Sequence, residues 1–116
     1  MKNELTIGER IFASGLILDI QGDLTKDAED ILLHQRNWSE GLGDGANVIL
    51  NFSEVEYINS AGIAVLIRLA QTGKKAGFTI YAFGINSHYQ KMFRLIGLAE
   101  FIMIYPDEYA LMQRFQ

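Results

Sequence analysis

Apolar and polar residues alternate over the stretch GLILDIQGDL (15–24), where leucine and isoleucine fall on every second position until Gly22. A period of two residues is that of a half-buried strand, so this stretch predicts a strand that stops at the glycine. The preceding residues, 4–13, predict an earlier pair of short strands with a turn near Gly8.

Three further runs are short and mostly apolar, and each predicts a strand; the first of them is β-rich and of the buried, central kind that parallel sheets use. They are NVILNF (47–52), FTIYAFG (78–84) and FIMIY (101–105).

Between these runs the apolar residues recur at intervals of three and four, which is typical of helices. The clearest case runs from Ser60 to about Lys75, with apolar residues at i, i+3, i+4 and i+7 from Ile63. Gly73 and Gly77 are predicted to end this helix.

Three weaker patterns predict further helices. The first covers about 25–40, with Thr25 as its cap and acidic residues in its first turn. The second has Asn86 or Ser87 as its cap, and the last has Pro106, Asp107 and Glu108 in its first turn.

Strands and helices therefore alternate from residue 15 onward, which favours an α/β fold with right-handed crossovers. We expect a mostly parallel central sheet of about four to six strands, an antiparallel N-terminal edge and about four packed helices. The length of 116 residues favours a single domain over 1–116.

Composition narrows the function classes. The chain has no cysteine, which excludes disulfides and thiolate metal sites, and its net charge of −4 argues against direct nucleic-acid binding. No secretory signal and no membrane span are predicted, so we expect a cytoplasmic protein. The charge is uneven: residues 1–56 hold 11 acids and 4 bases, whereas 57–116 hold 3 acids and 6 bases. The basic excess is typical of solvated helix faces or of a surface that attracts a charged partner.

The stretch YINSAG (57–62) places a serine at the predicted start of a helix. A catalytic Ser60 needs a base, but neither His34 nor His88 has a companion acid at a telling spacing, and no metal-ligand spacing occurs. We therefore expect no enzyme activity, no metal and no cofactor. Asn59 or Ser60 is a good helix cap.

A cap does not explain the two small residues that follow, Ala61 and Gly62. Two such residues leave the backbone open to another molecule, as on a docking surface or at a site that a kinase modifies.

The run NVILNFSEVEYINSAGIAVLIRLAQTGKKAG (47–77) resembles the core of STAS domains, and specifically of bacterial anti-sigma factor antagonists. Two other segments, LILDIQGDL and FRLIGLAEFIMIYPDEYAL, are similar to the family's early strand and its closing helix, strand and helix. The resemblance spans about residues 15–115 and implies a single STAS-like domain.

This resemblance implies a function in partner switching. The protein would bind an anti-sigma factor that is also a serine kinase, release a sigma factor for transcription, and be switched off by phosphorylation at Ser60; a separate phosphatase would reverse the modification. The implied partner-binding residues are Asn59, Ser60, Ala61, Gly62 and Val65.

Two residues depart from the family pattern, because Asn59 and Asn51 stand where aspartate is expected. If the kinase reads the first carboxylate, phosphorylation of Ser60 would be slower or absent. The alternative function is a STAS interaction module without a sigma factor, in a lipid- or anion-transport complex or a signalling assembly. Because the chain is about one domain long and begins with methionine, we expect association with such a machine rather than fusion to it.

Overall fold

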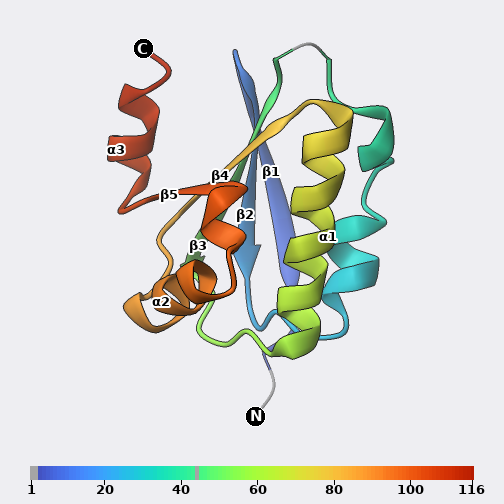
Figure 1. Ribbon diagram of the computed structural model, residues 1–116, viewed down its shortest axis with the longest axis vertical. Coiled ribbons are helices and arrows are strands. Elements are labelled where there is room, and N and C mark those ends of the chain that lie inside the picture. Colours follow the sequence, from blue (N-terminus) through green and yellow to red (C-terminus); the bar gives the residue numbers. More distant parts are fainter. Residues whose placement is uncertain (1–2, 44) are drawn as a thin grey trace.

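The computed structural model describes residues 3–43 and 45–116, which contain a five-stranded sheet (Figure 1). The strands lie side by side in chain order: β1 (Thr6–Phe12), β2 (Gly15–Gln21), β3 (Asn47–Glu54), β4 (Thr79–Phe83) and β5 (Ile102–Tyr105). β1 and β2 pair antiparallel, and all other neighbours are parallel. The predicted α/β fold with an antiparallel N-terminal edge is confirmed.

Right-handed crossovers between parallel strands in sequential order place their helices on one face of the sheet. This face carries α1 (Ser60–Ala76), α2 (Ser87–Leu95) and the short turns η1 (Glu29–Leu33), η2 (Trp38–Glu40) and η3 (Leu98–Glu100). The C-terminal helix α3 (Glu108–Gln113) packs on the opposite face.

The alternation within each strand divides the core between these two faces. Leu18, Leu50 and Ile80 point to the α1 side, where they form the larger core with residues such as Leu66. Their strand neighbours on the other face meet α3 in a smaller cluster, whose buried members are Ile17, Ile49, Tyr81, Phe83 and Leu111.

Arg10 of β1 links α3 to the sheet. Its guanidinium donates two hydrogen bonds of 2.7 Å to Asp19 and two further bonds, of 3.0 and 2.9 Å, to Glu108. Hydrogen bonding to Arg10 lowers the pKa of Asp19, because it stabilises the charged carboxylate.

We expect the variant Asp19→Asn to lose on the order of 1 kcal/mol of stability at pH 7, since the network is partly exposed and solvent-screened. The folded-state pKa of Asp19 is below its unfolded value, so its contribution is complete above about pH 4 and is lost as the pH falls through the folded pKa. Urea unfolding of both proteins at pH 7 and pH 2.5 measures this. A difference that persists undiminished at the lower pH would contradict the assignment.

The N-terminal region differs from the prediction of two short strands with a turn near Gly8. A single strand, β1, runs through this glycine, and the turn lies instead at residues 13–14. Gly8 pairs with Asp19 inside the strand and has no positive φ, so the chain does not turn at this position.

The predicted helix over 25–40 is also wrong. Only the π-helical turn η1 and the 3-10 turn η2 form there, and no side chain caps η1. Thr25 is buried, and its backbone carbonyl accepts from Ala28. The chain leaves the helical path because Trp38 enters the core, where its Nε1 donates to the carbonyl of Leu32 at 2.9 Å.

The helix predicted from Ser60 is confirmed as α1. It ends at Gly77, whose φ of 87° is the left-handed conformation of a C-cap. Gly73 does not end the helix but lies inside it, where a Cβ would meet the ring of Phe78 at 2.9 Å. The expected cap of the next helix is Asn86, whose side chain accepts from the backbone of Tyr89.

Candidate functional site

Hydrogen bonds to two neighbouring parts of the chain hold the segment before α1, and they fix where the helix begins. Leu24 and Ile58 extend the pairing of β2 and β3 as an isolated parallel bridge. The backbone N–H of Leu24 donates to Tyr57 at 2.9 Å, and its carbonyl accepts from Asn59 at 3.1 Å. The hydroxyl of Tyr89, from α2, accepts from the N–H of Ile58 at 2.9 Å. The start of α1 is therefore held by two parts of the chain at the carboxyl edge of the sheet, the segment after β2 and the helix α2.

Asn59 is the N-cap of α1. Its side-chain oxygen accepts from the backbone N–H of Gly62 at 3.0 Å, and its carbonyl accepts the first helical bond from Ile63. Ser60 is the first helical residue and is exposed, and its hydroxyl has no partner among the described contacts. The cap is thus supplied by Asn59, which leaves the Ser60 hydroxyl free.

The structure explains why position 62 is a glycine, which the sequence alone does not. A Cβ on this residue would lie 2.1 Å from the carbonyl oxygen of Leu24, so the close neighbour is the protein's own backbone. Gly62 and Val65 are buried, whereas Ser60 is exposed and Asn59 and Ala61 are half-buried. Partner binding at these five positions stays a prediction. In the free protein only Asn59, Ser60 and Ala61 are accessible at the surface.

We expect Asn59→Ala to cost about 1 kcal/mol of stability, because one N–H of the first turn loses its acceptor. Asn59→Asp is the matched control: it keeps the accepting oxygen and adds charge that the helix dipole favours, so its stability should equal or exceed that of the wild type. Chemical denaturation of the three proteins measures both effects. Equal stability of the alanine variant and the wild type would show that Asn59 is not the cap.

The second departure from the family pattern, Asn51, has a local explanation. Its amide nitrogen donates to Asp19 at 2.8 Å, and its oxygen accepts from the N–H of Ser53 at 2.9 Å. An aspartate here could accept from Ser53 but would face the Asp19 carboxylate with like charge. The amide is therefore matched to Asp19 on the neighbouring strand.

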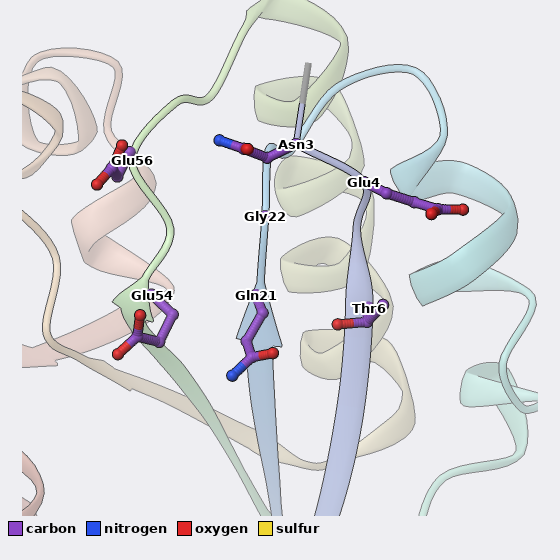
Figure 2. Close-up of a pocket in the computed structure, with 7 residues that line it drawn as sticks. All are labelled: Asn3, Glu4, Thr6, Gln21, Gly22, Glu54 and Glu56. Carbon is purple, nitrogen blue, oxygen red and sulfur yellow. The ribbon is translucent and has the colours of Figure 1, made fainter. Parts of the chain in front are cut away.

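An acidic cleft of about 640 Å³ lies at the same edge of the sheet (Figure 2). We call it the acidic cleft; its lining residues are Asn3, Glu4, Thr6, Gln21, Gly22, Glu54 and Glu56. Glu54 ends β3 and Glu56 belongs to the connection that leads to α1. Two of the three glutamates that line the cleft therefore lie on the part of the chain that leads to α1, and they make this surface negative. This cleft could not be predicted from the sequence, because residues far apart in the chain form it.

The described residues contain neither a nucleophile–base pair at Ser60 nor a metal cluster. His34 pairs with Asp30 at 3.2 Å, the ring of His88 contacts the ring of Tyr89 edge to face, and neither imidazole has a described bond to Ser60. In residues 3–43 and 45–116 no group of three or more His, Cys, Asp or Glu side chains is placed to hold a metal ion. In this part of the chain no helix has the length and apolarity needed to cross a bilayer.

The sequence profile of the STAS domain family matches residues 4–110. The chain belongs to the STAS domain family. No curated protein sequence matches this STAS domain.

Solved structures with the same fold include several antagonists. An anti-sigma factor antagonist from Mycobacterium paratuberculosis is 18% identical, with a TM-score of 0.66 over 96% of this chain and 93% of that one. The Bacillus cell fate determinant SpoIIAA, in its phosphorylated form, is 18% identical, with a TM-score of 0.68 over 97% and 100%. A sulfate transporter family protein from Wolinella succinogenes is 15% identical, with a TM-score of 0.68 over 90% and 87%. At these identities the similarity shows the fold.

Proposed function

We propose that this STAS domain is an anti-sigma factor antagonist that is switched off by phosphorylation at Ser60. Its partner would be an anti-sigma factor with serine kinase activity, and a phosphatase would restore the binding form. The proposed location is the cytoplasm. The observation that carries the proposal is the exposed, unbonded hydroxyl of Ser60 behind a cap that Asn59 already supplies. The domain acts by binding, with no chemistry of its own.

The position of Ser60 lets a phosphate change binding without changing the fold. A phosphoserine adds about −1.5 to −2 charge and three acceptor oxygens. At the first position of a helix this charge meets free N–H groups and the positive end of the dipole, so the free domain tolerates it. In an interface of roughly 800 Å² per side, an unmatched dianion costs several kcal/mol.

Incubation with a kinase-type anti-sigma factor and ATP, followed by mass spectrometry, tests the proposal. We expect one phosphate, on Ser60. Ser87 is the internal control, because it is also exposed and also follows an asparagine cap at the first position of a helix. Phosphate on another residue, or none, would contradict the assignment.

Asn59 gives a further prediction on the rate of this reaction. If the kinase reads a carboxylate next to its target, Asn59→Asp supplies that group and keeps the cap, so Ser60 should be phosphorylated faster, by about tenfold for a contribution of 1.4 kcal/mol. Initial rates with both proteins measure the effect. An unchanged or lower rate would show that this kinase does not use the carboxylate.

A second candidate function is a STAS module that binds a transport protein or a signalling assembly without a sigma factor. The fold similarity to the Wolinella sulfate transporter family protein favours it. The two functions differ in the partner: the antagonist binds a serine kinase and is released by ATP, whereas a transporter-associated module binds a membrane protein and does not respond to the nucleotide.

A further inference from the structure

A second surface, distinct from the Ser60 region and from the acidic cleft, lies along the C-terminal half of α1. It is a groove of about 850 Å³, which we call the basic groove; it is lined by Arg68, Gln71, Thr72, Lys74, Lys75 and Phe101. Three of the six lining residues are cationic and none is acidic. In a chain of net charge −4 this local excess is the opposite of the overall charge.

The cations of the basic groove are only partly neutralised. Arg68 forms an exposed ion pair with Glu29 at 2.6 Å. The ammonium of Lys74 lies 5.3 Å from the centre of the Phe101 ring, which holds it at the groove without a carboxylate. Neither Lys74 nor Lys75 forms an ion pair with any carboxylate in residues 3–43 and 45–116. Two charges are therefore available to a ligand.

Phe101 adds an apolar contact to this charged surface. Phe101 is 41% exposed and directly follows the turn η3, in which Leu98 is buried and Glu100 is exposed. Lysines in the last turn of a helix stabilise the helix dipole, but that role requires neither an exposed aromatic ring nor a groove. Cationic side chains around an exposed ring match a ligand that is both acidic and apolar.

We propose that the basic groove binds an acidic segment of the protein partner, with carboxylates at Lys74 and Lys75 and one apolar side chain on Phe101. This inference rests on the proposed function, since it names a second contact of the same partner. Continuity of the surface supports it: Ser60, Ala64, Arg68 and Gln71 are all exposed, at spacings of four, four and three residues on one side of α1. A partner that covers Ser60 can therefore extend along this helix into the groove.

The distance between the two contacts makes them separable. At 1.5 Å per residue, Lys74 lies about 21 Å along the helix axis from Ser60. This exceeds the Debye length of about 8 Å at physiological ionic strength, so charges at the two ends act independently. An anionic membrane fits less well, because binding to it relies on clusters of about 4–8 cations and the chain as a whole is negative.

The test uses the full chain, labelled with ¹⁵N, and a short synthetic peptide of glutamates around one central phenylalanine. We expect amide shifts in residues 68–75 and 98–101, and weaker binding as salt is added. The double variant Lys74→Glu, Lys75→Glu should reduce the affinity by at least about tenfold. The control, Lys91→Glu with Arg94→Glu on α2, makes the same charge change outside the groove and should bind as the wild type does.

Three outcomes would overturn the inference: no shifts, shifts confined to the Ser60 region, or equal binding of a peptide in which lysine replaces glutamate. Cosedimentation with phosphatidylglycerol vesicles, lost in the groove variant, would assign the surface to a membrane instead. Ser60→Asp should bind the peptide as well as the wild type does. The proposal for the basic groove can therefore be contradicted while the proposal for Ser60 holds, and the reverse is also possible.

Discussion

Replacing Ser60 by aspartate is expected to lower the affinity for the anti-sigma partner by more than a hundredfold. A loss of about 3 kcal/mol is enough for this effect, and an unpaired charge in a desolvated interface costs that much or more. The free protein should keep its stability, because aspartate at the first position of a helix is favoured by the dipole. The variant therefore separates binding from folding.

Ser87→Asp is the matched control for this experiment. It adds the same charge at the same helical position, behind an asparagine cap of the same geometry, in α2 instead of α1. Isothermal titration calorimetry with the kinase-type partner should show a large loss for Ser60→Asp and a change of no more than about threefold for Ser87→Asp. Equal losses would mean that the effect is general repulsion by added negative charge.

The second large effect is expected on stability, from Gly62→Ala. The added Cβ would lie 2.1 Å from the carbonyl oxygen of Leu24 and 2.7 Å from its carbon, so backbone must move. Overpacking of this kind costs typically 1–3 kcal/mol, and the helical preference of alanine returns only about 1 kcal/mol. We expect a net loss of about 1–2 kcal/mol, in the upper part of the resulting range because the close contact is with backbone, together with disturbed positions of Asn59 and Ser60, whose segment pairs with Leu24.

Gly8→Ala is the control for the glycine substitution. Gly8 is an exposed position in β1 with an ordinary φ, and nothing lies within 4 Å of an added Cβ. Its free energy of unfolding should change by less than about 0.5 kcal/mol. If Gly62→Ala is as mild as Gly8→Ala in urea unfolding, the contact with Leu24 is not the reason for the glycine.

Much of the fold could be predicted from the sequence because periodicity reports burial. The strands that begin at Gly15, Asn47 and Thr79 are mostly buried, and α1 has a continuous apolar stripe. The segment 25–40 was mispredicted for the opposite reason. Its apolar stripe is weak, so the tertiary packing of Trp38, rather than local preference, decides the path of the chain.

The candidate site, like the fold, could be predicted from the sequence only in part. The helix start at Ser60 and a cap at Asn59 follow from local chemistry, since a short polar residue before an apolar periodic run predicts both. The role of Gly62 depends on Leu24, which is distant in the chain, so one sequence shows that a small residue is present but not what it contacts. The acidic cleft and the basic groove, likewise, combine residues from several elements.

Thermal unfolding of the protein that carries phosphoserine at position 60, compared with the unmodified protein, is the most direct test of Ser60 as a switch. We expect a melting temperature that is unchanged or slightly raised, because a phosphate on the exposed Ser60 would lie at the positive end of α1. A drop of roughly 5 °C or more, corresponding to about 1 kcal/mol in a protein of this size, would contradict it. That result would mean that Ser60 holds the fold together and does not serve as a switch.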